Sequence, residues 1–507
     1  MDTFVRLEGI TKRFPGVLAL DKVDFDIFPG EIHALLGENG AGKTVLTNIL
    51  SGRYHLDEGQ IYFLDQPIDS SKWSARKALE LGIGMVYQDF MLVEEHTVLE
   101  NIALADLSLP FFPDYEKILE SIVTLGEKYG LNVDPSAEIW QLSVGEKQRV
   151  EIIKALMHGS KVLIMDEPTA VLTPQEADDL FVILKEIAKE GTSIIFISHK
   201  LPEVFAICDR ITVLRKGQHT GTVDVDDTNE KELAKMMVGR EVFLQTKKAN
   251  IQSGNPVLEV KNVSATSDRQ TKALDQISLT VREGEIFGLA GVSGNGQKEL
   301  AEIITGLRSI DAGSLAMNGK DITNNTPQKS IKEGIGHIPD DRLGMGVVPG
   351  LGMPESAILK NYKSPKYSWK KTFLNKKEIN LYAQEMIDTF NIVTAGINNP
   401  VNLLSGGNLQ KVIIAREMSE KPSLLVAVHP TQGLDVGATE FVRESLEKQR
   451  INKAAILLIS EDLEELLAVS DKIGVIYEGQ IVNVMDTKDT SIEELGLLMT
   501  GASVGSV

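Results

Sequence analysis

The sequence of 507 residues has one cysteine, Cys208, and no long apolar run. A single cysteine excludes an intrachain disulfide and a cysteine-rich zinc site, so we interpret Cys208 as a small core residue. No apolar run reaches the roughly 18 to 20 residues that a membrane span needs, and the start, MDTFVRLEGITKRF, is not typical of a signal peptide. We therefore expect a cytosolic protein that contacts a membrane only through a partner.

Positive charge is also scarce in this chain. The sequence has 52 Lys and Arg against 72 Asp and Glu, a formal net charge of -20. A nucleic-acid-binding surface needs basic side chains to neutralise phosphates. The charge balance argues against broad binding to nucleic acid and leaves room only for a local basic patch.

Two regions of the chain repeat each other. AlaLeuAsp at 19–21 recurs at 273–275, an offset of 254, and DRITVLRKGQ at 209–218 resembles DKIGVIYEGQ at 471–480, an offset of 262. A duplication with a few inserted residues is the simplest account of these offsets. The chain is also too long for one typical core.

The repeat predicts two domains joined by a linker. Residues 245–256, QTKKANIQSGNP, are polar, contain Gly and Pro, and lie between the copies. We expect the first domain to span 1–244 and the second 257–507. Each copy alternates β-rich runs (IHALLG, KVLIMDE, TSIIFIS) with helical stretches such as GKTVLTNILSG and EADDLFVILKEIAKE. This order predicts an α/β fold, with a mainly parallel sheet covered by helices and ligand loops at the strand ends.

The first copy contains an intact phosphate-binding loop of the pattern GxxxxGK[ST]. Only glycines let a backbone curl tightly enough for its N–H groups to surround phosphates, and the following helix adds its positive end. We expect Lys43 to reach the β- and γ-phosphates of ATP and Thr44 to hold Mg²⁺. The loop consists of Gly37, Glu38, Asn39, Gly40, Ala41, Gly42, Lys43 and Thr44.

Two further chain segments place polar side chains at strand ends. An apolar strand at 162–165 ends in Asp166 and Glu167, where one carboxylate can hold Mg²⁺ through water and the other can polarise an attacking water. An Asp-Glu pair after an apolar run is by itself more often a solvated strand end. Here ProThrAla follows, and the next strand, SIIFIS, delivers His199, which can contact the γ-phosphate.

The two copies are damaged in complementary places. At 291–296 the second copy has the loop glycines, but Gln297 and Lys298 replace the lysine and hydroxyl. A second motif is intact as LSGGN at 404–408 and altered to LSVGE at 142–146.

With these motifs the chain resembles the nucleotide-binding domains of ATP-binding cassette (ABC) proteins, twice over nearly its whole length. LSVGE and LSGGN match the family's signature motif. The resemblance implies a P-loop NTPase core, an antiparallel β subdomain and a helical subdomain in each copy. It also implies that Phe14 stacks on adenine and that Gln88 senses Mg²⁺ and the membrane partner. Asp166, Glu167 and His199 then take the metal-binding, catalytic and switch positions, whereas Thr173 departs from the aspartate that many members have.

The same resemblance predicts that the second copy has lost turnover. Asp268 stands opposite Phe14, and Val428 cannot support a metal where the first copy has Asp166. The other replacements are Gln297 for Lys43, Lys298 for Thr44, Asp340 for Gln88, His429 for Glu167 and Glu461 for His199. Weak binding of nucleotide without hydrolysis stays open.

In the ABC family two domains face each other head to tail, and each ATP lies between the phosphate loop of one and the signature of the other. The resemblance therefore implies that the two halves of this chain pair and turn over one ATP per closure. The second half would complete the site of the first through Ser405, Gly406, Gly407, Asn408 and Asp435.

Among ABC proteins, the chain fits an importer ATPase better than a soluble protein that acts on ribosomes or DNA, because it has one degenerate site, a short linker and one cysteine. The implied partners are two integral-membrane permease subunits and an extracytoplasmic substrate-binding protein, with no nucleic acid. We expect a peripheral location at the cytoplasmic face of a bacterial cell membrane. Segments at 142–152, 167–176, 290–300 and 430–442 look more like the nucleoside branch, with simple sugars as the alternative.

Coupling to the permeases is expected at two segments. Residues 91–101 mix apolar and acidic side chains, as a groove for a permease helix does, although a plain helix start capped by Thr97 explains them equally well. In the second half, residues 342–355 are rich in Gly and Met and are the corresponding candidate.

Overall fold

The structure divides into two compact units, residues 1–242 and 243–507. It is a computed structural model, and it describes residues 3–87, 90–105, 114–169, 172, 174–240, 248–249, 251–268, 270–370, 372–499 and 501. Part of the expected linker at 245–256 lies outside these residues, so the expected domain boundaries stay a prediction. Its described residue Ala249 is held on the second unit, where its N–H donates to Glu447 over 2.8 Å.

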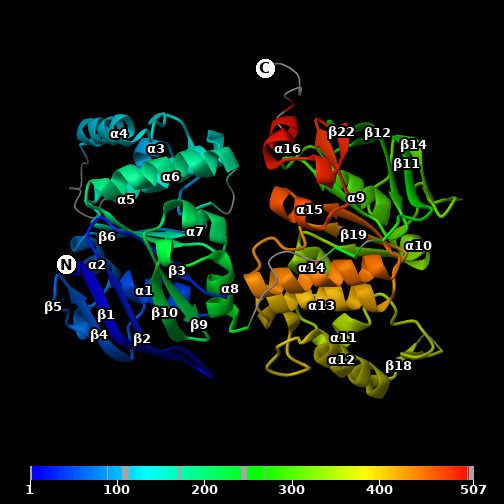
Figure 1. The fold of residues 1–507 in the computed structure, drawn as a ribbon, viewed down its shortest axis with the longest axis horizontal. Coiled ribbons are helices and arrows are strands. Elements are labelled where there is room, and N and C mark those ends of the chain that lie inside the picture. The colour runs from blue at the N-terminus through cyan, green and yellow to red at the C-terminus, as the bar shows by residue number, and fades with distance from the viewer. Residues whose placement is uncertain are drawn as a thin grey trace. The chain divides into compact units, whose positions relative to one another are not determined.

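The first unit contains an antiparallel sheet and a mainly parallel one (Figure 1). The antiparallel sheet has the order β2-β1-β4-β5. Its strands are β1 Val5–Phe14, β2 Val17–Ile27, β4 Glu58–Phe63 and β5 Gln66–Pro67. The larger sheet has the order β10-β9-β3-β8-β7-β6, with only β10 antiparallel to its neighbour. Its strands are β3 Ile32–Leu36, β6 Ile83–Val86, β7 Val162–Asp166, β8 Ser193–Ile197, β9 Arg210–Arg215 and β10 Gln218–Asp224.

Helices cover the larger sheet of the first unit, which is why its central strands are mostly apolar and are buried along almost their whole length. These helices are α1 Lys43–Leu50, α2 Ala75–Glu80, α3 Val98–Ala105, α4 Tyr115–Tyr129, α5 Val144–Met157, α6 Pro174–Lys189, α7 Leu201–Ile207 and α8 Glu230–Val238. Helices α3, α4 and α5 contact one another and form the helical subdomain. Cys208 is buried at the end of α7, so its interpretation as a core residue is confirmed.

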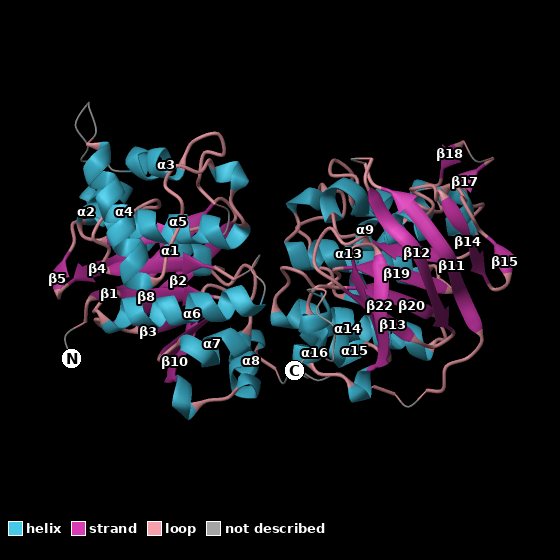
Figure 2. Cartoon of the chain, turned by 90° about the horizontal axis from the view of Figure 1, so that it is seen from above, coloured by secondary structure: helices cyan, strands magenta, loops and turns pink. Residues whose placement is uncertain are grey.

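The second unit repeats both sheets and adds a hairpin. Figure 2 shows the antiparallel strands β11, β12 and β14 side by side. The strand orders are β12-β11-β14-β15 and β16-β19-β20-β13-β21-β22, and among the described strands β17 and β18 form a separate pair. The strands are β11 Pro256–Thr266, β12 Lys272–Arg282, β13 Ile286–Ala290, β14 Ala312–Met317, β15 Lys320–Asp321, β16 Ile335–Ile338, β17 Ser368–Trp369, β18 Phe373–Leu374, β19 Leu424–Val428, β20 Ala455–Ile459, β21 Lys472–Tyr477 and β22 Gln480–Asp486.

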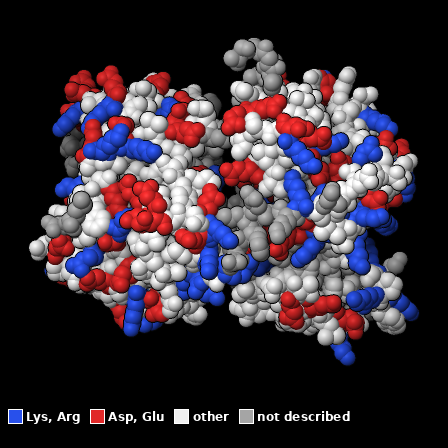
Figure 3. Space-filling model, in the orientation of Figure 1, with Lys and Arg blue, Asp and Glu red and all other residues white. Residues whose placement is uncertain are grey.

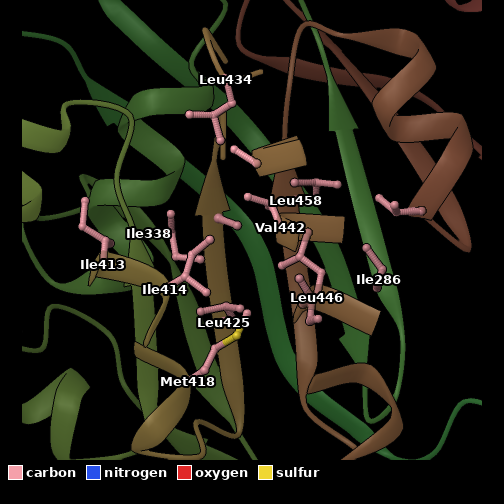
Figure 4. Close-up of a cluster of buried hydrophobic side chains, with 14 of the residues drawn as sticks. Ile286, Ile338, Ile413, Ile414, Met418, Leu425, Leu434, Val442, Leu446 and Leu458 are labelled. Carbon is pink, nitrogen blue, oxygen red and sulfur yellow. The ribbon is translucent and has the colours of Figure 1, made fainter. Parts of the chain in front are cut away.

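The helices of the second unit pack on this sheet around an apolar core. The core joins Ile286 of β13, Leu425 of β19 and Leu446 of α14 (Figure 4). The helices are α9 Gln297–Thr305, α10 Pro327–Lys332, α11 Met353–Ala357, α12 Lys376–Phe390, α13 Gly406–Ser419, α14 Val436–Ile451, α15 Leu463–Val469 and α16 Ile492–Met499, with one π-helical turn at Arg342–Gly346. The predicted α/β fold, with parallel core sheets, antiparallel subdomains and helical subdomains, is confirmed in both units. In the described part of the chain, every helix is too short or too polar to cross a membrane.

Candidate functional site

Three adjacent strands of the first unit bring the predicted catalytic groups together. Strand β8 lies between β3 and β7, and all three run parallel. The phosphate loop follows β3, Glu167 follows β7, and His199 follows β8. Since the carboxyl ends of parallel strands meet at one edge of a sheet, the loop, the acid and the histidine share that edge.

The backbone of the phosphate loop needs its glycines. Gly37 has φ 154° and Gly42 has φ 105°, values that L residues with side chains rarely adopt. A Cβ on Gly37 would lie 2.4 Å from the carbonyl oxygen of Leu214, and a Cβ on Gly42 would lie 2.6 Å from Leu20 Cδ2. Both glycines are therefore required by space as well as by backbone conformation.

Lys43 makes hydrogen bonds to the backbone of its own loop. Its buried ammonium donates hydrogen bonds to the carbonyl oxygens of Gly37 over 2.6 Å and Glu38 over 3.2 Å. Thr44, the next residue, is exposed on the first turn of α1. The helix N-terminus, the ammonium and the hydroxyl together form an anion-binding end to the strand–loop–helix unit.

The two adjacent carboxyl groups of Asp166 and Glu167 have pKa values that are shifted in opposite directions. Burial raises the pKa of Asp166 to about 6, the charge of Glu167 adds to the rise, and Lys43 opposes it. Burial also favours a higher pKa for Glu167, but His199, Lys43 and Lys200 outweigh it and hold that pKa below its usual value. Glu167 Oε1 lies 3.3 Å from His199 Nδ1. The pair thus gives one carboxyl group whose pKa is raised to about 6 and one whose pKa is held below its usual value.

The backbone at Glu167 is strained, and the second unit has the same strain. Glu167 has φ 47°, and its N–H donates to the carbonyl of Ile197 over 2.9 Å. His429 has φ 43°, and its N–H donates to the carbonyl of Ile459 over 2.8 Å. Left-handed conformations at residues other than glycine cost about 1 to 3 kcal/mol and persist only where the surrounding structure enforces them. The second unit therefore keeps the backbone conformation of the Glu167 position without the carboxylate.

A buried glutamate of α7 ties the two catalytic loops together. Thr169 Oγ1 donates to Glu203 Oε1 over 2.7 Å, and Ser198 Oγ donates to Glu203 Oε2 over 2.7 Å. Thr169 lies two residues after Glu167, and Ser198 directly precedes His199. Glu203 is thus placed to fix the acid and the histidine relative to each other.

Sequence reasoning missed Glu203, although the repeat contained the signal. Thr431, Ser460 and Glu465 each stand 262 residues after their counterparts. They form the same contacts, with both hydroxyls donating to Glu465 over 2.6 Å. Three polar residues that recur at one offset, outside the known motifs, are the pattern that indicates a shared buried contact.

Three other predicted site residues are not part of this cluster: Phe14 lies on β1, and two others lie outside the described residues. Phe14 ends β1 with 37% of its surface exposed, and its ring meets Tyr54 edge-on at 5.6 Å between centroids. Lys12 Nζ lies 5.6 Å from the same ring centroid. Stacking of Phe14 on adenine stays a prediction. Gln88 and Thr173 lie outside the described residues.

In the second unit, neutral and ionic contacts replace the groups that are predicted to bind nucleotide in the first. Gln297 is buried like Lys43, and its amide donates to the carbonyl of Val292 over 3.0 Å, so it braces the loop without a charge. The Phe14–Tyr54 ring contact is replaced by an ion pair, in which Arg308 Nη2 lies 2.8 Å from Asp268 Oδ1. Other contacts thus stand at the two positions where the second unit lacks the aromatic ring and the lysine.

Both signature motifs begin a helix. Ser405 caps α13 by accepting from the N–H of Asn408 over 3.4 Å, and Ser405 and Gly406 are exposed. A Cβ on Gly406 would meet only Arg342, at 3.7 Å. In the first unit Val144 stands at the position of Gly406 with its side chain exposed. The N-terminus of α13 in the second unit is therefore accessible, whereas a branched side chain stands at the equivalent N-terminus of α5 in the first unit.

The expected cap of α3 is present. The N–H of Glu100 donates to Thr97 Oγ1 over 3.2 Å, and the N–H of Thr97 donates to Glu100 Oε2 over 2.8 Å. The loop before it is fixed to α5, because Glu151 accepts from the N–H of Met91 over 2.8 Å and Lys154 donates to its carbonyl over 3.1 Å. Met91 and Val93 expose their side chains from this braced loop. Its role in docking stays a prediction.

Comparison with known families agrees with these two units. The family described as ABC transporter matches residues 20–170 and 274–432, which is more than half of the chain. The chain belongs to the ABC transporter family. It is a nucleotide-binding protein and an ATP-hydrolysing enzyme coupled to transport.

Full-length relatives share this double organisation. The nucleoside import ATP-binding protein NupA of Lactococcus lactis is 46% identical over 99% of both chains. The guanosine import ATP-binding protein NupO of Bacillus subtilis is 45% identical over 99% of this chain and 98% of its own. The glucose import ATP-binding protein TsgD13 of Haloferax volcanii is 44% identical over 99% of this chain and 96% of its own. The archaeal ribosome recycling factor aABCE1 shares the fold alone, with a TM-score of 0.65, 17% identity, and coverage of 97% of this chain and 92% of its own.

The buried Glu465 makes a testable contribution to stability. Burial raises its pKa to about 7, and Asp462 adds to the rise. A folded-state pKa above the model-peptide value stabilises the fold fully below that value, and the contribution is lost as the pH rises through about 7. We expect the parent chain to lose about 3 kcal/mol of unfolding free energy between pH 4.5 and 8 relative to Glu465→Gln. Urea unfolding of both chains across this range measures the difference.

The neighbouring Glu464→Gln provides the control, because it removes the same charge from an exposed position. A pH profile of Glu465→Gln parallel to that of the parent would show that Glu465 does not titrate in this window.

Proposed function

We propose that the chain is the ATP-hydrolysing subunit of a membrane importer, most suitably one for nucleosides. The first unit would bind ATP with Mg²⁺, and the signature motif of the second unit would complete the binding site. The observation that carries this proposal is the complementary damage: Lys43, Asp166, Glu167 and His199 gather in the first unit, while the unobstructed signature at Ser405 belongs to the second.

The residues of the first unit suit a nucleotide with a divalent cation. Asp166 and Glu167 adjoin each other, and burial together with the charge of Glu167 raises the pKa of Asp166, a shift that a bound cation would oppose. Thr44 and Asp166 would hold the cation, with Gln88 as the third predicted ligand. Bound Mg²⁺ supplies charge neutralisation on the phosphates. The ionised Glu167 is suited to orient and deprotonate an attacking water, and His199 fixes its carboxylate.

The second unit would contribute a lid. We assign Ser405, Gly406, Gly407 and Asn408 to the γ-phosphate bound by the first unit, with Asp435 against the opposite phosphate loop. Support comes from the accessible N-terminus of α13, whose positive end is suited to an anion. The mirror-image site would combine Gln297 with Val144 and is proposed to be inactive.

The importer assignment follows from the relatives named above, which are import ATP-binding proteins for nucleosides, guanosine or glucose. Two permease subunits and a substrate-binding protein are the proposed partners, and the chain would bind the cytoplasmic face of the membrane. The segments at 91–101 and 342–355 are the proposed docking sites. A simple sugar is the second candidate substrate, because the glucose relative is nearly as similar as the nucleoside relatives.

The proposed substrate is tested by reconstituting the chain with its permeases and binding protein in proteoliposomes. We expect nucleosides to stimulate ATP hydrolysis severalfold and simple sugars to have no effect. Stimulation by glucose or ribose alone would replace the nucleoside assignment by the sugar one. A hydrolysis rate that ignores the permeases and responds to ribosomes would overturn the importer proposal.

The catalytic assignment predicts opposite effects at two equivalent positions. Glu167→Gln should lower the rate of ATP hydrolysis at least about a hundredfold with unchanged ATP affinity, because the ionised base is lost and the fold is not. His429→Gln, at the same strained position of the second unit, should leave the rate near the parent value. Phosphate release and nucleotide titration measure the two quantities. Turnover retained in Glu167→Gln would refute the assignment.

The lid assignment predicts a similar contrast between the two signatures. Ser405→Ala and Ser143→Ala remove the same helix cap, each at a stability cost of about 1 kcal/mol. Only Ser405→Ala should lower the rate of hydrolysis, by about tenfold or more, because only Ser405 would face the competent site. Equal losses in the two variants would mean that the caps act through stability alone.

A further inference from the structure

A basic segment of the second unit contrasts with the rest of this acidic chain. Between Glu355 and Glu378 the sequence has seven lysines and no Asp or Glu, although the chain has a net charge of -20. The hairpin of β17 and β18 lies within this segment. Among the described strands, those of the first unit include no such hairpin.

The base of the hairpin is fixed to the helical subdomain. Tyr367, Ile358 and Ile379 form a small buried cluster, and the rings of Tyr367 and Tyr382 lie 5.3 Å apart. The N–H of Asn375 donates to the carbonyl of Tyr367 over 2.8 Å and closes the hairpin at the start of α12. The hairpin therefore projects from a packed support.

Aromatic side chains beyond this base point to solvent. Trp369 and Phe373 are each 65% exposed, and their ring centroids lie 6.1 Å apart. Leu374 and Tyr362, which belong to the same basic segment, are also exposed. Grouped exposed apolar side chains on a rigid element indicate a contact surface.

Lysines that form no ion pair with a described carboxylate lie along the same segment as these rings. Lys363 Nζ lies 5.4 Å from the ring centroid of Tyr362, and Lys370 Nζ lies 5.0 Å from that of Trp369. The exposed lysines that form no ion pair with a described carboxylate are Lys363, Lys366, Lys370, Lys376 and Lys377. In Figure 3, Lys and Arg side chains gather at the edge of the second unit where Figure 1 places β18. The acidic groups facing the base are Glu378, Glu385 and Glu420.

We propose that this hairpin binds the anionic surface of a phospholipid bilayer, with the rings of Trp369 and Phe373 entering the headgroup region and the lysines contacting lipid phosphates. Tryptophan favours the membrane interface, and lysine keeps its ammonium in water while its stem lies along apolar material. Clustered lysines attract anionic leaflets. The proposal rests on the proposed function, which places the chain at a membrane.

A bilayer fits better than nucleic acid because of what adjoins the hairpin. Its base packs on α12, which contacts α11, and α11 begins within the segment at 342–355 that is proposed to meet a permease. A surface next to a permease contact is within reach of lipid. The hairpin would thus hold the second unit at the membrane through contacts that the permease does not supply.

The experiment uses the purified full chain without permeases and vesicles of two compositions. The chain should sediment with phosphatidylcholine and phosphatidylglycerol mixed at about 2:1, be released by salt, and stay in solution with phosphatidylcholine alone. Equal binding to both vesicles, or to neither, would overturn the proposal. Binding to single-stranded RNA with no binding to anionic vesicles would assign the surface to nucleic acid instead.

Charge reversal provides a matched pair of variants. Lys363→Glu with Lys370→Glu should weaken binding to anionic vesicles by about tenfold or more. Lys329→Glu with Lys332→Glu changes the net charge equally on α10, where both lysines are exposed and unpaired among the described residues, and should leave binding near the parent value. Equal losses in the two variants would mean that overall charge, and not the hairpin, determines binding.

Fluorescence tests the place of Trp369 directly. The chain has three tryptophans, of which Trp73 is buried, so in a Trp140→Phe background a response to vesicles reports Trp369. We expect anionic vesicles to shift its emission to shorter wavelength and brominated lipid to quench it. Bound chain with unchanged emission would refute entry of the ring.

These outcomes are separable from those of the proposed function. Stimulation of hydrolysis by permeases in detergent tests the importer without lipid. Stimulation with no hairpin-dependent vesicle binding would refute the lipid proposal alone, and vesicle binding without stimulation would refute the importer alone.

Discussion

The geometry of each unit depends on one buried carboxylate that accepts hydroxyl hydrogen bonds from two loops. Glu203 joins the loop after β7 to the loop after β8, and these loops carry Glu167 and His199. A buried carboxylate without partners is costly, so the fold is most favourable when both hydroxyls are in place. That requirement helps to fix the separation of Glu167 and His199 and supports the left-handed backbone at Glu167.

The second unit shows that this framework and the chemistry are separable. Glu465 keeps the same contacts, and His429 keeps the same backbone, although no catalytic acid remains at that position. Gln297 braces its loop as Lys43 does, and the ion pair of Asp268 with Arg308 takes the place of an aromatic contact. The substituting residues Gln297 and Asp268 therefore make contacts of their own at the positions of the lost lysine and aromatic ring.

Much of the fold could be predicted from the sequence, because apolar strand runs and a repeat at a constant offset identify two α/β units. Most of the candidate site could also be predicted, because its glycines and strand-end polar residues form patterns that are local in the sequence. Glu203 could not be predicted, because its partner Thr169 is 34 residues away and a glutamate in the first helical turn is typical of a solvated surface. The hairpin of β17 and β18 escaped since strands of two residues leave no periodicity.

The solitary thiol has a practical consequence for the study of motion in this chain. Cys208 is buried, and burial raises the pKa of its thiol far above the usual range, so it stays protonated and unreactive toward maleimides or spin-label reagents. Thiol reagents are therefore expected not to label the wild-type chain. Two cysteines introduced at exposed sites, one in each unit, would carry the labels, and the distance between their probes would measure any movement of one unit relative to the other without prior removal of the native cysteine.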